Sequence, residues 1–412
     1  MQLITDTGAL GAFCSQLAED PFIAVDTEFM RERTFWPKLC LVQVAGPSAA
    51  AAIDPLADGI DLAPLLALLT RPEIVKVFHA ARQDLEIFYQ LIGALPAPVF
   101  DTQVAAMVCG FGDQVGYETL AARLARAKLD KASRFTDWSV RPLSQRQIEY
   151  ALSDVTHLRE IYRKLKRKLE ASRRSNWLAE EMATLTDPAT YRVDPLEAYR
   201  RLKTRAANGR FLAILREVAA WREREAQHRD APRAWVLRDE ALMEIAHHAP
   251  TTADALARTR GLGRKFADGQ QGAQVLAAVR RGLDLPEDEL PVAAAKRETP
   301  RGAGPIADLL KVLLKLKCEE EDVAQRLVAS ADDLEALAAM GEAAEVPALH
   351  GWRRLLFGED ALRLRDGSIG LAVRGGKLTV IAIPDPDAGG DAGANAGASA
   401  GGGAEANAGG GD

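Results

Sequence analysis

The chain has 412 residues, 48% of them hydrophobic, and a formal net charge of −6. This length accommodates two or three domains with cores of their own. Widely spaced cysteines exclude a zinc ribbon or a disulfide scaffold and favour a reducing compartment. No apolar run approaches the roughly 18 residues that span a membrane, and the N-terminus lacks a secretory pattern. We therefore expect a soluble, cytoplasmic protein with no membrane partner.

Basic side chains are concentrated in residues 161–285, between two more acidic ends. A polyanion such as a nucleic acid would bind this middle region. Arginine-rich helices are also often only solvated surfaces, so charge alone leaves both interpretations open.

Strands alternate with helices over the first 170 residues. The pattern predicts strands at residues 2–4, 22–25, 39–45, 49–53, 74–78 and 99–100. It predicts helices at about 7–17, 62–69 and 81–92, a helix capped by residues 101–102, and a helical stretch over 118–162. Consecutive strands followed by strands that alternate with helices indicate a mixed α/β sheet with helices on its faces.

Two carboxylates, Asp26 and Glu28, follow the apolar run Phe22–Val25. Residues i and i+2 of a strand point to the same face, so both acids project together. Close like charges repel, and a divalent cation such as Mg²⁺ or Mn²⁺ relieves that repulsion. On its own, an Asp-x-Glu sequence after a strand is more often a loop or a helix cap.

Further acids follow at useful places. Asp84 lies in the first turns of the helix that leaves the strand at 74–78, and strand ends are where sites form in open α/β sheets. An acid at that position also suits the helix dipole. Tyr150 and Asp154 are four residues apart and share one helix face. Together the four carboxylates can hold two divalent ions about 4 Å apart, an arrangement that hydrolyses phosphodiesters.

These motifs resemble the ribonuclease D family. The resemblance rests on Asp26-Thr27-Glu28-Phe29, the following Arg31, Thr34 and Phe35-Trp36-Pro37, the strand Leu39–Gln43, the run His79–Glu86, and Tyr150-x3-Asp154. It covers residues 1–170 and implies a ribonuclease H-like fold in the tyrosine-containing branch of the four-carboxylate 3′–5′ exonucleases. It also implies that the metal ligands are Asp26, Glu28, Asp84 and Asp154.

Tyr150 would orient the attacking water, because an unperturbed tyrosine, with a pKa of about 10, is a poor base at neutral pH. The expected product is a nucleoside 5′-monophosphate. Candidate RNA contacts are basic or aromatic side chains that can meet phosphates or stack on bases, namely Arg31, Phe35, Arg82, Lys131, Arg233, Arg264 and Lys265.

The remainder of the chain is predicted to be mostly helical. Residues 171–200 form a helical linker, and residues 201–285 resemble a helicase-and-RNase-D C-terminal (HRDC) domain, which implies nucleic-acid binding. After a linker at 286–304, residues 305–384 resemble a second, diverged HRDC domain ending in a β-hairpin. The Gly/Ala-rich tail at 385–412 is expected to be disordered. The predicted architecture is therefore an α/β domain followed by one or two small all-α bundles.

The leading hypothesis is a monomeric exoribonuclease that uses two divalent cations to trim 3′ extensions of tRNA precursors and other structured RNAs. One alternative keeps the chemistry but acts on DNA. The other is an RNA-binding protein with an inactive nuclease domain, and the intact set of four acids and Tyr150 argues against it.

Overall fold

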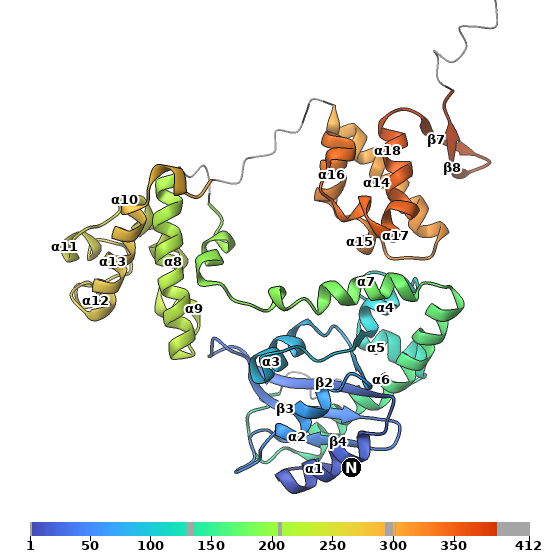
Figure 1. The fold of residues 1–412 in the computed structure, drawn as a ribbon, viewed down its shortest axis with the longest axis horizontal. Helices are drawn as coiled ribbons and strands as arrows, with labels where there is room; N and C mark the ends of the chain where they lie inside the picture. Colours follow the sequence, from blue (N-terminus) through green and yellow to red (C-terminus); the bar gives the residue numbers. More distant parts are fainter. Residues whose placement is uncertain (1, 130–135, 205–207, 293–299, 301, 385–412) are drawn as a thin grey trace, which may run out of the picture. The chain divides into compact units, whose positions relative to one another are not determined.

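The structure is a computed structural model that describes residues 2–129, 136–204, 208–292, 300 and 302–384 (Figure 1). The chain forms two compact units, Met1–Glu298 with Asp322–Leu327, and Thr299–Glu321 with Val328–Asp412. Within the described part of the chain, no helix is both long and apolar enough to cross a membrane. The tail predicted to be disordered lies outside the described residues.

In the described part of the first unit, six strands form one sheet. They are β1 (Gln2–Ile4), β2 (Phe22–Met30), β3 (Lys38–Ala45), β4 (Ala50–Ile53), β5 (Val75–Phe78) and β6 (Val99–Asp101). Their order is β1-β4-β3-β2-β5-β6. Strand β3 runs antiparallel to both β2 and β4, whereas the other neighbouring pairs are parallel. This mixed sheet confirms the predicted fold class and places β2 in its interior, where both edges of the strand are paired.

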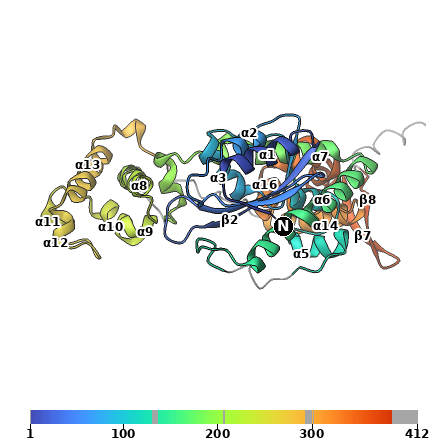
Figure 2. The same ribbon diagram turned by 90° about the horizontal axis from the view of Figure 1, so that it is seen from below.

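Among the described residues, several α-helices flank this sheet. They are α1 (Thr7–Leu17), α2 (Ala63–Leu69), α3 (Arg82–Ile92), α4 (Thr102–Val108), α5 (Tyr117–Leu120), α6 (Gln145–Ala171) and α7 (Ser175–Leu185). Their starts follow sequence signals: Asp6 caps α1 by accepting from the backbone N–H of Ala9 at 2.8 Å, and Ser144 opens α6 with a capping box. Figure 2 shows α1 and α2 on one side of the sheet.

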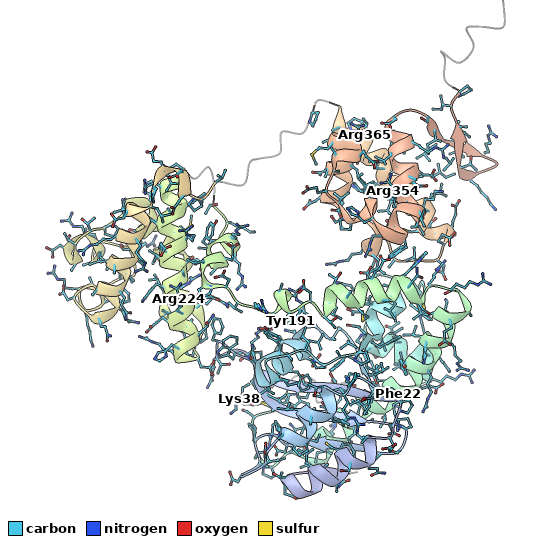
Figure 3. The ribbon with its side chains drawn as sticks, in the orientation of Figure 1. Phe22, Lys38, Tyr191, Arg224, Arg354 and Arg365 are labelled. Atoms are coloured by element: carbon cyan, nitrogen blue, oxygen red, sulfur yellow. The ribbon has the colours of Figure 1, made fainter. Side chains whose placement is uncertain are left out.

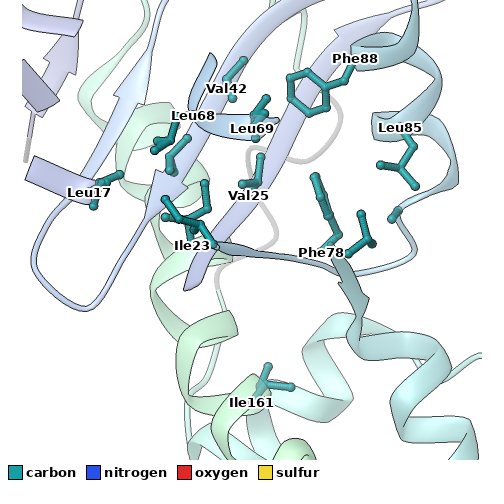
Figure 4. Close-up of a cluster of buried hydrophobic side chains, with 14 of the residues drawn as sticks. Leu17, Ile23, Val25, Val42, Leu68, Leu69, Phe78, Leu85, Phe88 and Ile161 are labelled. Atoms are coloured by element: carbon teal, nitrogen blue, oxygen red, sulfur yellow. The ribbon is translucent and has the colours of Figure 1, made fainter. Parts of the chain in front are cut away.

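The alternation of side chains along β2 separates two hydrophobic cores. Ile23 and Val25 pack with leucines of α1 and α2 and with α3, in the cluster that Figure 4 shows in part. Phe22 and Ala24 point the other way and pack against α6. Even-numbered residues of β2 therefore face α6, and odd-numbered residues face α1, α2 and α3.

Two predicted boundaries were wrong. Strand β2 continues to Met30, so Asp26 and Glu28 lie within the strand rather than after it. The predicted helical stretch over 118–162 is broken: α5 passes into a π-helical turn that ends at Arg126, whose φ of 54° is left-handed, and α6 begins only at Gln145. Tertiary packing overrides the periodicity here, because Trp138 and Leu143 enter a core beneath α6 instead of continuing a helix.

The first unit also contains a helical bundle. Its helices are α8 (Gly209–Arg229), α9 (Arg233–Val236), α10 (Asp239–His248), α11 (Ala253–Leu256), α12 (Arg264–Ala267) and α13 (Gln270–Asp284). Leu215 and Val218 of α8 pack with Leu242 of α10 and Val279 of α13. Most of the middle of α8 is buried, including the charged residues Glu217, Arg222 and Glu223, whereas Arg224 is exposed (Figure 3).

The second unit is a smaller bundle that ends in a hairpin. It contains α14 (Ala303–Glu320), α16 (Ala331–Met340), α17 (Gly351–Arg353) and α18 (Glu359–Arg365), with α15 (Gln325–Val328) at its boundary with the first unit. Strands β7 (Ile369–Arg374) and β8 (Lys377–Ala382) pair antiparallel, as the sequence predicted. Leu313, Trp352 and Phe357 are among its buried residues.

Candidate active site

Strand β2 directs Asp26 and Glu28 toward α6. Both are even-numbered residues, like Phe22 and Ala24, whose side chains pack against that helix. Asp26 is half-buried and lies opposite Gln43 of β3 in the antiparallel register. A register shift between Glu28 and Phe29 marks a bulge just beyond the two acids. A β-bulge re-aims the side chains around it and commonly occurs next to a functional site.

Helix α6 brings Tyr150 and Asp154 to the same place. Asp26, Tyr150 and Asp154 all line one cavity of about 270 Å³, together with His79 and Tyr117. The Tyr150 ring lies 6.1 Å from the ring of buried Trp138, which packs beneath α6. The segment before α6 therefore supports the residue that sequence analysis assigned to the attacking water.

Asp84 approaches the site from the other face of β2. It is buried, and Thr27, which lies between Asp26 and Glu28 on the strand, donates a hydrogen bond to it. Burial raises the pKa of Asp84 well above its usual range, and the neighbouring charge of Asp26 raises it further. Burial also raises the pKa of Asp26, to about 7. Burial therefore accounts for the raised pKa of Asp26, whereas Asp84 is affected both by burial and by a neighbouring like charge.

The turn that carries Asp84 is held by Asp101. Ala80, between β5 and α3, has a left-handed φ of 58°. Asp101 accepts hydrogen bonds from the backbone N–H groups of Ala80 at 3.1 Å and Ala81 at 2.8 Å. The same carboxylate caps α4 through Gln103, the capping role predicted from the sequence. Asp101 thus fixes the start of α3 and, with it, the position of Asp84.

The residues brought together fit a divalent cation in chemistry, although the structure does not present a finished coordination shell. Among the described residues, no group of three or more histidine, cysteine, aspartate or glutamate side chains is arranged to hold one metal ion. The structure does bring Asp26 beside Asp84, and Asp26 and Asp154 to one cavity. Carboxylate oxygens are the ligands that Mg²⁺ and Mn²⁺ prefer, and a cation would offset the like charge of this pair.

Sequence reasoning missed two residues of this site. Thr27 was treated only as part of the motif, yet its hydroxyl contacts Asp84. Tyr117 was not singled out, because no spacing pattern links it to the acids. Its hydroxyl donates to the backbone carbonyls of Asp154 and, at 3.2 Å, Ser153, and its ring lies 5.5 Å from that of His79. Tyr117 therefore connects the turn before α3 to the helix that carries Asp154.

Two predicted RNA contacts are engaged elsewhere. Phe35 is only 7% exposed and belongs to the core of the α8–α13 bundle. The Arg233 guanidinium lies 4.4 Å from the centre of its ring and also pairs with buried Glu223. Asp230 accepts hydrogen bonds from the backbone N–H groups of Phe35 and Trp36 at 3.0 and 2.9 Å. These contacts give Phe35 and Arg233 structural roles and depart from the expected stacking and phosphate binding.

The other predicted contacts differ in their surroundings. Arg31 pairs with Glu86 at 2.5 Å, and Arg264 pairs with Asp254 and Asp268. Arg82 and Lys265 are exposed, and neither forms an ion pair with any residue that the structure describes. Lys131 lies outside the described residues.

Two protein-family models match the chain. A 3′–5′ exonuclease model matches residues 1–170, which contain the sheet and the cavity. An HRDC domain model matches residues 211–279, which contain most of the first helical bundle.

Relatives match this chain over nearly its whole length. The chain is 54% identical to a ribonuclease D of Gluconacetobacter diazotrophicus over 376 residues, which cover 91% of this chain and 95% of that protein. It is 52% identical to a ribonuclease D of Granulibacter bethesdensis over 92% of this chain and 96% of that protein. The crystal structure of Escherichia coli RNase D superposes with a TM-score of 0.75 at 33% identity, covering 89% of this chain and 98% of that one.

Proposed function

We propose that this chain, which belongs to the ribonuclease D family and is a 3′–5′ exoribonuclease, trims 3′ extensions of tRNA precursors and other structured RNAs with the help of two divalent cations. The observation that carries this proposal is the convergence of Asp26, Tyr150 and Asp154 on one cavity, with Asp84 beside Asp26. The 3′-terminal nucleotide would enter this cavity.

The roles of the residues follow from their chemistry. Asp26, Glu28, Asp84 and Asp154 would hold Mg²⁺ or Mn²⁺ ions, which, when bound, supply charge stabilisation for the phosphodiester and acidify a coordinated water. Tyr150 would orient the water whose oxygen attacks the terminal phosphorus. The bond from phosphorus to the 3′ oxygen breaks, that oxygen takes a proton, and a nucleoside 5′-monophosphate leaves.

The helical regions would bind the rest of the RNA. We retain the division into an exonuclease domain at 1–170, an HRDC domain at 201–285 and a second HRDC-like bundle at 305–384, joined by linkers at 171–200 and 286–304. Arg82 and Lys265 are the strongest candidate phosphate contacts. Both are exposed, and neither forms an ion pair with another residue in the described part of the chain. The protein would act as a monomer in the cytoplasm, without a membrane partner.

One experiment separates the three hypotheses. Purified protein is incubated with a 3′-extended RNA and with single-stranded DNA of the same sequence, each with Mg²⁺, Mn²⁺ or EDTA. We expect stepwise release of 5′-monophosphates from RNA with either metal and none in EDTA. Preferred degradation of DNA would replace the proposed substrate, and turnover in EDTA would refute the metal-dependent mechanism.

Salt dependence tests the proposed phosphate contacts. Each lost phosphate contact should lower the slope of log Kd against log salt concentration by about 1. We expect this change for Lys265→Gln and for Arg82→Gln, measured by RNA binding in EDTA. Asp58→Asn, an exposed change in the exonuclease domain, should leave the slope unchanged. An unchanged slope in both basic variants would remove these residues from the RNA path.

A further inference from the structure

Gln43 occupies a central position beside the active site. It lies on β3, opposite Asp26 in the antiparallel register, and its side chain is completely inaccessible to solvent. Residues opposite each other in an antiparallel pair project to the same face of the sheet, so Gln43 and Asp26 both point toward α6. That helix carries Tyr150 and Asp154.

The amide of Gln43 is buried without a hydrogen-bond partner among the described residues: neither its nitrogen nor its oxygen has one. Burying an amide without compensation costs on the order of 1–3 kcal/mol in proteins, so such groups are rare. An apolar side chain of similar size would fill this space at lower cost.

Neighbouring buried polar groups are satisfied, which makes Gln43 an exception in this sheet. Lys76 of β5 is also fully inaccessible, and its ammonium donates to the carbonyls of Arg71, Ile74 and Ala97. Asp101 accepts several backbone N–H groups. The fold therefore supplies partners for buried polar side chains at other positions around the same strands.

The nearest candidate partner by register is the carboxyl group of Asp26. Directly opposite residues of an antiparallel pair have Cβ atoms about 4.5–5.5 Å apart, within reach of a glutamine amide. A carboxylate accepts hydrogen bonds with both oxygens, and an amide nitrogen donates two. Because neither amide atom has a partner among the described residues, nothing fixes which of them faces Asp26. A carboxylate accepts hydrogen bonds, so the orientation that turns the amide nitrogen toward Asp26 is the favourable one.

We propose that Gln43 is a positioning residue for Asp26, whose carboxylate accepts a hydrogen bond from the Gln43 amide when metal ions are held at the site. This inference rests on the proposed function of Asp26 as a ligand. The hydrogen bond restricts the rotation of Asp26 and leaves its other lone pairs for the cation. Residues that orient metal ligands typically change metal affinity by about 10–100-fold when they are removed.

Under this proposal, removing the Gln43 amide lowers metal affinity without lowering the stability of the metal-free protein. Gln43→Leu removes an unsatisfied amide, so thermal stability in EDTA should stay the same or rise. The same change removes the support of Asp26, so Mn²⁺ affinity, measured by calorimetry, should fall by about tenfold or more. A purely structural glutamine, for example one that binds an internal water, would lose stability while keeping its Mn²⁺ affinity.

Two further variants complete the test. Leu41→Met changes another buried side chain of β3 without removing a polar group and should alter neither stability in EDTA nor Mn²⁺ affinity by a comparable amount. Gln43→Met replaces Gln43→Leu if that variant fails to fold. Reduced Mn²⁺ affinity with stability retained supports the proposal, and unchanged affinity overturns it. Because calorimetry needs no turnover, the result stands apart from whether the protein degrades RNA.

Discussion

Buried charges are treated differently in the helical bundle and at the acid-bearing part of the sheet. In the bundle, Glu223 is fully buried and pairs with Arg233, while buried Arg222 pairs with Asp239 at 2.5 Å. Glu217, also buried, pairs with Arg281 at 3.0 Å. In the sheet, Asp84 lies beside Asp26, and burial together with this like charge raises the pKa of Asp84.

The buried charges of the bundle stabilise the fold, whereas those of the sheet are placed to act in catalysis. A buried charge costs free energy unless an opposite charge or hydrogen bonds compensate it. The bundle provides that compensation within its own chain. The sheet leaves two carboxyl groups in a state that favours protonation or a bound cation, as expected of a site that acts on an external ligand. Removing a charge should therefore impair RNA hydrolysis at the sheet and stability in the bundle.

The largest effect is expected at the sheet. Asp26→Asn should reduce the rate of RNA hydrolysis by on the order of 10³-fold or more, because it removes a ligand from the proposed metal centre. RNA binding in EDTA should survive. Single-turnover hydrolysis of a 3′-extended RNA measures the rate, and Asp58→Asn serves as an exposed control. Asp154→Asn should behave like Asp26→Asn. Full hydrolytic activity in both variants would refute the proposed metal site.

The next effect is expected in the bundle. Glu223→Gln should lower the free energy of unfolding by about 2–4 kcal/mol, because it leaves Arg233 without its charge partner. Urea unfolding of the full-length protein measures the change. Arg264→Gln breaks two exposed ion pairs, which solvent screens, and should therefore lower the free energy of unfolding much less than Glu223→Gln. Equal losses in the free energy of unfolding for the two variants would show that the buried ion pair stabilises the bundle no more than an exposed one.

The smallest effect concerns pH. Asp26 has a folded-state pKa of about 7, above its unfolded value of about 4. The folded state therefore binds the extra proton, and its contribution to stability is present at pH 4 and lost as the pH rises through 7. Because Asp26 is partly exposed to solvent, screening keeps the change modest.

The metal-free protein is the form in which this pH dependence can be measured. Thermal unfolding in EDTA should show stability falling between about pH 4 and pH 7. Asp84→Asn removes a neighbouring carboxyl group whose own pKa is raised and should flatten that profile, whereas Asp58→Asn should not. A profile that is identical in wild type and Asp84→Asn would contradict the coupling of the two acids.

Much of the fold could be predicted because local signals agreed with the tertiary structure. The β1 strand, the helix over residues 7–17 and the C-terminal hairpin lie where the sequence placed them. The helical prediction for 118–162 failed because Trp138 and Leu143 pack into a core that periodicity does not reveal. The expected base-stacking role of Phe35 could not take its packing into account. Its ring lies under Arg233, almost 200 positions away in sequence.

The sequence by itself determined which acids form the candidate site, because strand alternation places Asp26 with Glu28 and helical spacing places Tyr150 with Asp154. Only the tertiary structure decided what supports them. Thr27, Tyr117 and Gln43 contact or oppose these residues across strand and helix pairs. Local periodicity specifies the face on which a side chain lies, whereas its partners across the sheet are set by how the whole chain packs.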